Sequence, residues 1–169
     1  MKMFAIGLLA LALGVAQPAQ AADAVVAGQR APEISAQGSN GQPLKLAALR
    51  GQVVLLDFWA SWCGPCKQSF PWMNAMHARY APQGLRIVAV NVDKRREAAE
   101  RFLAQSPARF TLGWDEDGRT PEAFGVRTMP SSVLIDGDGR VLHVHAGFRE
   151  EDAADLEQRI SAALAGWRK

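Results

Sequence analysis

The sequence contains very little cysteine: Cys63 and Cys66 are the only two in 169 residues. Their C-x-x-C spacing closes too short a loop for a disulfide to restrain the unfolded chain, so a purely structural disulfide is disfavoured. A structural zinc site would need two more ligands at metal-binding spacing, and the chain offers only His77, His143 and His145. The scarcity of cysteine therefore favours a redox pair, with no metal site and no cofactor.

A strong charge of one sign is also absent. Lysine and arginine total 19, aspartate and glutamate total 17, and the formal net charge is +2. This near balance predicts neither a nucleic-acid partner nor attraction to an anionic membrane surface. The chain also has no internal repeat and no low-complexity linker. We therefore expect one domain, over residues 28–167.

The N-terminus carries the pattern of a secretory signal peptide. Lys2 precedes an apolar stretch, Phe4 to Ala16, that is shorter than the roughly 20 residues needed to span a bilayer. We expect residues 1–21 to be a signal peptide that directs the protein to the periplasm and is cleaved after about Ala21. Anchoring by an uncleaved signal is the less favoured alternative. No cysteine lies near this site, which argues against a lipid-modified N-terminus.

The segment around the cysteines predicts a buried strand followed directly by a helix. An apolar run, Val53 to Ala60, leads into the pair, and residues 67–80 place apolar side chains at helical spacing. A helix N-terminus presents unpaired N–H groups, which would stabilise a thiolate at Cys63. Cys66 would lie one turn further on, within reach of a mixed disulfide formed on Cys63.

The remaining patterns complete an α/β chain. Residues 22–31 are expected to be a loose lead-in, followed by a hairpin with Leu44 and Leu46 on its second arm. Thr120 is expected to cap a short helix that begins at Pro121. The order predicts a mixed sheet with helices on both faces. Strands are expected at 85–92, 110–112, 133–136 and 141–145, and further helices at 94–106 and 150–167.

The stretch from Trp59 to Lys67 resembles the signature of the thioredoxin superfamily. The wider pattern is similar to its exported thiol–disulfide branch, the TlpA and ResA proteins. Ala31-Pro32, the Gly41 turn, and an insertion of about 25 residues from Asp93 to Arg119 all fit that branch. The resemblance implies a thioredoxin fold with an N-terminal β-hairpin and a central insertion.

The resemblance also implies roles for particular residues. Met129-Pro130 matches the family's cis-proline loop, which lies beside the disulfide and pairs with the substrate chain. Pro71 matches a kink in the helix after the cysteines, and Asp57 matches a buried carboxylate. The expected substrate-binding residues are Trp62, Gly64, Pro65, Met129 and Pro130.

Two positions depart from the exported branch. Asp57 stands where that branch usually has Asn, and Ser69 stands where it usually has an acid. Burial should raise the pKa of Asp57 and let it take the proton of Cys66. The alternative is a strand-end carboxylate that is satisfied by the backbone or by Lys67.

We therefore expect a protein-disulfide reductase, because Gly64-Pro65 is the dipeptide of the reducing end of the superfamily. The expected substrates are disulfides of client proteins of the cytochrome c maturation type. The expected electron donor is a membrane protein of the DsbD type, and we expect a monomer. Alternatives are a disulfide oxidase or isomerase, a thiol peroxidase, and a non-catalytic copper or apocytochrome chaperone. His143 and His145 share one strand face, and a solvated edge is favoured there over a copper site.

Overall fold

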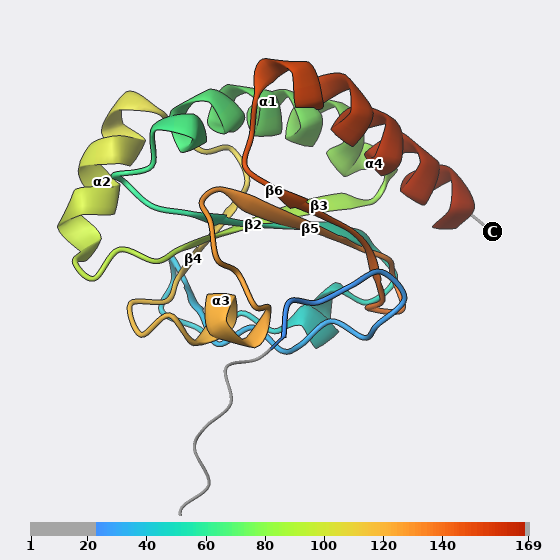
Figure 1. Ribbon diagram of the computed structural model, residues 1–169, viewed down its shortest axis with the longest axis horizontal. Coiled ribbons are helices and arrows are strands. Elements are labelled where there is room, and N and C mark those ends of the chain that lie inside the picture. The colour runs from blue at the N-terminus through green and yellow to red at the C-terminus, as the bar shows by residue number, and fades with distance from the viewer. Residues whose placement is uncertain (1–22, 168–169) are drawn as a thin grey trace, which may run out of the picture.

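The computed structural model describes residues 23–167, so the predicted signal peptide lies outside the described residues. Within them, six strands form one sheet in the order β1-β4-β3-β2-β5-β6 (Figure 1). Strand β2 runs parallel to β3, and β3 runs parallel to β4, whereas β5, β6 and β1 join antiparallel. The strands are β1 Gln37–Gly38, β2 Val53–Trp59, β3 Leu85–Asn91, β4 Thr111–Trp114, β5 Ser131–Ile135 and β6 Val141–Ala146.

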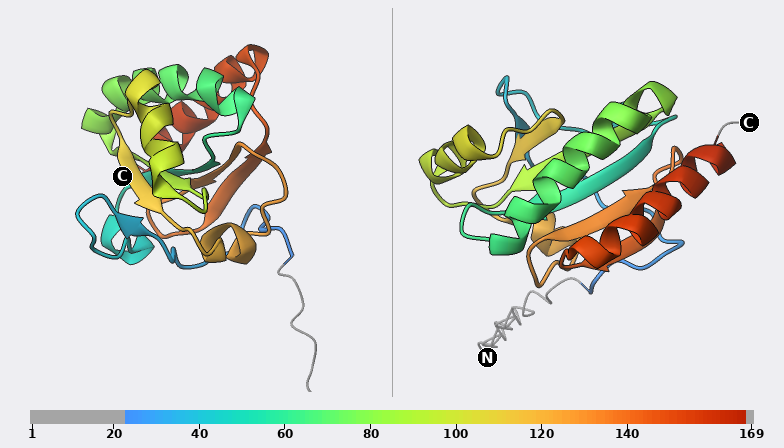
Figure 2. Two further views of the ribbon diagram at one scale, coloured as in Figure 1. Left: turned by 90° about the vertical axis from the view of Figure 1, so that its left-hand side faces the viewer. Right: turned by 90° about the horizontal axis from the view of Figure 1, so that it is seen from above.

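Helices cover both faces of the sheet, as predicted (Figures 1 and 2). Three α-helices, α1 Gly64–Tyr80, α2 Arg96–Gln105 and α4 Ala153–Trp167, pack on one face. The short helix α3, Arg119–Ala123, and the 3₁₀ helix η1, Leu46–Leu49, lie on the other. Helices α1 and α4 lie side by side in the right-hand view of Figure 2. Two further 3₁₀ turns are η2 Ala81–Gln83 and η3 Glu150–Asp152. No helix in residues 23–167 is long and apolar enough to cross a membrane.

Strand β2 is the centre of the molecule because all seven of its residues are buried. Its side chains alternate between two hydrophobic cores, as expected for a strand covered on both faces. On the α1 side the core contains Val53, Leu55 and Trp59. On the α3 side it contains Val54, Leu56 and Phe58. Asp57 falls between Leu55 and Trp59 in this alternation, so its side chain faces α1.

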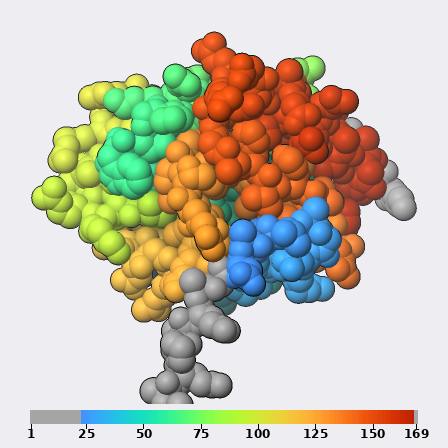
Figure 3. All heavy atoms as spheres, in the orientation of Figure 1, coloured from blue at the N-terminus to red at the C-terminus, as the bar shows by residue number. Residues whose placement is uncertain are grey.

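The N-terminal segment is packed, and the prediction of a loose lead-in for residues 22–31 is wrong for the described part. Val25 is only 7% exposed, and its N–H donates to the carbonyl of Phe124 at 3.2 Å. Gly28 donates to Val141 at 2.8 Å. Figure 3 shows this blue segment packed against the orange surface of the C-terminal half. The small and polar residues of this segment predicted a loose lead-in. In the structure, hydrogen bonds to Phe124 and Val141 order its backbone.

The predicted N-terminal hairpin is present but short. Gly38 donates to Gln42 at 2.8 Å, and Leu44 donates to Ala36 at 2.9 Å. The second arm contributes a single bridge, between Pro43 and Gln37. Leu46, expected on that arm, instead lies in η1. The sheet partner of β1 is β4, within the central insertion.

Helix α3 is capped from outside, so the prediction of Thr120 as its N-cap is wrong. Gly118 occupies the N-cap in a left-handed conformation with φ 75°, and Thr120 lies inside the helix. The Asp115 carboxylate accepts hydrogen bonds from the N–H groups of Gly118, Arg119 and Thr120 at 3.0, 3.2 and 2.6 Å. Because Asp115 satisfies these donors, the Thr120 hydroxyl is free to accept the N–H of Ser35 at 3.0 Å.

Candidate active site

The two cysteines form a disulfide at the junction of strand and helix. Cys63 is the N-cap of α1, and its sulfur accepts the N–H of Cys66 at 3.2 Å. The Cα atoms are 5.3 Å apart and the S–S bond is 2.03 Å. Cys63 is only 3% exposed, and Cys66 is 0% exposed. The sulfur at the end of the helix lies where backbone N–H groups favour negative charge.

The residues around the disulfide form an apolar rim, and they differ in how far they are exposed to solvent. Trp62 is 71% exposed, while Gly64 and Pro65 are also on the surface. Met129 is half-buried against both hydrophobic cores, and the Met129–Pro130 peptide is cis, as the resemblance implied. An exposed tryptophan beside a buried sulfur offers an apolar contact for an incoming chain. A role for these five residues in substrate binding stays a prediction.

A buried carboxylate positions the loop that precedes Cys63. Asp93 accepts the N–H and the hydroxyl of Ser61 at 2.8 and 2.9 Å. The side-chain amide of Asn91 donates to the same carboxylate at 2.8 Å. The sequence did not mark Asp93 as a site residue. Its place directly after β3, beside the end of β2, is the signal that could have identified it.

Asp57 is buried on the side of the sheet that faces α1. Its side chain is 1% exposed, and Oδ1 accepts a hydrogen bond from the Ser132 hydroxyl at 2.7 Å. Burial raises the pKa of Asp57 from 3.8 to about 7, although the Ser132 hydrogen bond acts in the opposite direction. Lys67, considered as a partner, is exposed and is not among the causes of the shift. The carboxyl group can therefore change its charge near neutral pH.

Ser69 replaces the expected acid by a neutral hydroxyl. It is 2% exposed, and its Oγ donates to the carbonyl of Cys66 at 3.1 Å. A serine hydroxyl bound back to the preceding turn is a structural contact of the helix. Asp57 is consequently the carboxyl group of the strand–turn–helix segment, residues 53–80.

The two histidines of β6 do not lie on a solvated edge, and that expectation is wrong. Both are half-buried, and neither Nε2 atom makes a hydrogen bond within residues 23–167. Nε2 of His145 lies 3.4 Å from the Asp152 carboxylate. Within the same residues, no group of three or more His, Cys, Asp or Glu side chains could hold a metal ion. Helix α4 and η3 cover this face, which the strand pattern alone could not reveal.

Taken with the central strand, the disulfide at the N-terminus of α1 defines a thiol–disulfide oxidoreductase of thioredoxin fold. The family model of Redoxin matches residues 26–160, and the chain belongs to this family. A crystal structure described as a thiol:disulfide interchange protein DsbE, from Chlorobium tepidum, superposes with a TM-score of 0.81. It is 52% identical in sequence, and the match covers 83% of this chain and 99% of that one.

Curated relatives agree with the structural match. Thiol-disulfide oxidoreductase ResA of Bacillus subtilis (strain 168) is 33% identical over 129 residues, which are 76% of this chain and 72% of that protein. ResA of Geobacillus thermodenitrificans (strain NG80-2) is 32% identical over 139 residues, which are 82% and 79% of the two chains. The predicted class of enzyme and the predicted fold are confirmed.

Proposed function

We propose that this protein is an exported reductase of protein disulfides, with clients of the cytochrome c maturation type, and that it acts as a monomer. The observation that carries the proposal is the buried Asp57, whose pKa of about 7 lets it exchange a proton on the cysteine side of the sheet at neutral pH. Gly64-Pro65, the dipeptide of reducing members, supports this direction of electron flow. The signal-peptide pattern of residues 1–21 supports export to the periplasm.

The first step is attack by the Cys63 thiolate on a client disulfide. One client sulfur bonds to Cys63, and the other leaves as a thiolate that takes a proton from water. The N-terminus of α1 stabilises the negative charge on Cys63 before attack. Because Cys63 is almost buried, the client must approach over the exposed indole of Trp62 and the Met129-Pro130 loop.

The second step resolves the mixed disulfide. Asp57 takes the proton of the Cys66 thiol, and the Cys66 thiolate attacks the sulfur of Cys63. The client leaves as a second thiolate, and the Cys63–Cys66 disulfide remains, which is the state of this structure. Two electrons pass from the enzyme dithiol to the client. A membrane electron donor of the DsbD type would then restore the dithiol.

Two other functions remain as alternatives. A disulfide oxidase or isomerase would use the same cysteines with a higher reduction potential. Thioredoxin-type reductases have potentials of about −270 mV and strong periplasmic oxidants about −120 mV. Equilibration with glutathione or dithiothreitol should place this protein near the lower value. A copper or apocytochrome chaperone would keep its binding function without a catalytic cycle through Cys66.

The proposal is tested by reduction of insulin disulfides with dithiol as the electron source. The wild-type protein should accelerate the reaction, and Cys63→Ser should not. Cys66→Ser should accumulate mixed disulfides with its clients, because the resolving thiol is missing. A Cys66→Ser protein that still binds its clients but forms no mixed disulfides would instead favour the chaperone, and wild-type activity equal to Cys63→Ser would contradict the proposal.

A further inference from the structure

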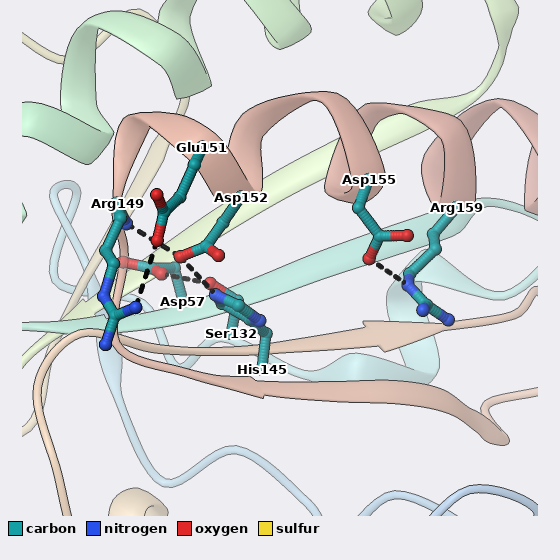
Figure 4. A network of polar contacts seen from close by, with 8 residues as sticks. All are labelled: Asp57, Ser132, His145, Arg149, Glu151, Asp152, Asp155 and Arg159. Atoms are coloured by element: carbon teal, nitrogen blue, oxygen red, sulfur yellow. Dashed lines mark hydrogen bonds and ion pairs between the residues drawn. The ribbon is translucent and has the colours of Figure 1, made fainter.

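A row of polar side chains crosses three strands beneath η3 and α4. Asp57 of β2 is opposite Ser132 of β5, and Ser132 is opposite His145 of β6. Opposed residues of neighbouring antiparallel strands point to the same face. His145 Nε2 then lies 3.4 Å from Asp152 of η3. Figure 4 shows these four side chains following one another from the centre of the sheet to its edge.

Burial decreases along this row. Asp57 is 1% exposed and Ser132 is 7% exposed, whereas the side chains of His145 and Asp152 are 21% and 26% exposed. On its other side, Asp57 is opposite Ala89 of β3, which has no polar side-chain atom. Among the described residues, Oδ2 of Asp57 has no hydrogen-bond partner, so Ser132 is the polar side chain bonded to this carboxyl group.

A small cavity lies between the hydroxyl and the histidines. Its volume is about 10 Å³, and the surface that lines it is apolar, so it offers no polar partners to a bound water. The Nε2 atoms of both histidines are buried without a hydrogen bond in residues 23–167. The polar row therefore reaches β6 through Ser132 and the residue opposite it, His145.

We propose that Ser132 and His145 form the path by which Asp57 returns its proton to solvent; this rests on the role of Asp57 in the proposed function. Neutral Asp57 passes its proton to Ser132 Oγ, whose own proton moves to His145, the residue opposite Ser132 on β6. His145, as an imidazolium beside Asp152, releases the proton to solvent. The net change is a Cys66 thiol converted to a thiolate and one proton delivered to water. Ser132 and His145 are positioning residues that act through Asp57.

The charges around His145 are suited to this role. Asp152 of η3 is the carboxylate within ion-pair distance, and its Oδ2 also accepts the backbone N–H of Arg149 at 2.9 Å. On α4, Arg159 binds Asp155 at 2.7 Å and lowers the pKa of that carboxyl group. Burial, followed by Arg159, lowers the pKa of His143, which keeps that ring neutral at pH 7. His145 is therefore the imidazole of the pair that lies within ion-pair distance of a carboxylate.

The experiment measures how fast Asp57 exchanges its proton. In the reduced protein labelled with ¹³C at aspartate carboxyl groups, relaxation dispersion at the midpoint of the Asp57 titration gives this rate, extrapolated to zero buffer. His145→Gln should slow the exchange by roughly 10²-fold, the lower end of what a positioned proton-transfer group contributes. Ser132→Ala should also slow it, and should raise the pKa of Asp57 because a hydrogen bond to the charged form is lost. Ser132→Thr, which keeps the hydroxyl, should restore the wild-type rate.

The matched control is His77→Gln, because His77 is also half-buried with an unbonded ring nitrogen but lies on α1. It should leave the exchange rate unchanged. Wild-type rates in both His145→Gln and Ser132→Ala would overturn the path and indicate release on the cysteine side. The readout needs no substrate, so absence of insulin reduction would contradict the proposed function without affecting this result.

Discussion

At the scale of single residues, Asp57 links folding to pH. Burial raises its pKa from 3.8 to about 7, so between these values the folded protein holds a proton that the unfolded chain has released. Its contribution to stability is therefore greatest below the unfolded pKa and is lost as the pH rises through the folded pKa. At 1.36 kcal/mol per pKa unit, the loss amounts to roughly 4 kcal/mol above neutral pH.

Replacing Asp57 by Asn should remove this dependence. We expect the Asp57→Asn protein to be more stable than wild type by up to roughly 4 kcal/mol at pH 8, and the difference to vanish near pH 3.5. Urea unfolding across this range checks the prediction. Asp138→Asn, at an exposed turn position, is the matched control. A stability difference that does not change with pH would show that Asp57 is already ionised throughout.

Sequence reasoning identified Cys63, Cys66 and Asp57 because they lie within one strand–turn–helix segment. The burial of Asp57 and the direction of its pKa shift followed from the place of this acid on an apolar strand. The partner of Asp57 did not follow, because Ser132 lies 75 residues away and meets it only through the pairing of β2 with β5. A hydroxyl in a buried strand has no local pattern that reveals its partner.

At the scale of elements, helix α3 depends on a cap that precedes it. Asp115 is 4% exposed and accepts three backbone N–H groups at the start of the helix. Asp115→Ala should leave these donors unsatisfied and lower the free energy of unfolding by about 1–3 kcal/mol. Urea unfolding measures the loss. Asp117→Ala is the control, because this carboxylate is 70% exposed in its ion pair with Arg119. Equal losses in the two variants would contradict the cap.

The elements themselves were largely predictable. Periodicity placed β2, α1, β3, α2 and α4 within a few residues of their observed bounds. The errors came where tertiary contacts replaced local ones. Thr120 is not the cap because Asp115 accepts the N–H groups at the start of α3, and the second arm of the hairpin ends after one bridge while β1 also pairs with β4. In both places the helix start or the turn was predicted near the right residues, but the hydrogen-bond partners were not.

At the scale of the whole molecule, the N-terminal segment joins two distant parts of the fold. Val25 bonds to the end of α3 and packs in the core on that face, while Gly28 bonds to β6. A protein that begins at Arg30 should lose roughly 2 kcal/mol or more relative to one that begins at Ala22, since burial of one valine alone contributes about that amount. Thermal and urea unfolding of the two proteins compare them. Equal stability would mean that the segment is only a linker.

The sheet also holds the cysteine pair and the acid at the same end of β2, because Asp57 lies two residues before the last residue of the strand. The disulfide follows the carboxyl end of the strand, and the side-chain alternation of the strand places Asp57 on the same side of the sheet as both cysteines. The covering helices α1 and α4 keep this carboxyl group from water. The fold thus places a buried carboxyl group on the cysteine side and leaves Trp62 of the apolar rim exposed.

The most direct test of this account is stopped-flow reduction of a small aromatic disulfide across pH 5 to 9, with resolution of the mixed disulfide followed separately from attack. In the wild-type protein, the rate of resolution should rise as Asp57 loses its proton near pH 7. Asp57→Asn should remove that rise and slow resolution at neutral pH, by at most about 10²–10⁴-fold. Attack by Cys63 should change less, because the helix N-terminus is untouched. Identical pH profiles for the two proteins would contradict the account and make Asp57 a structural residue.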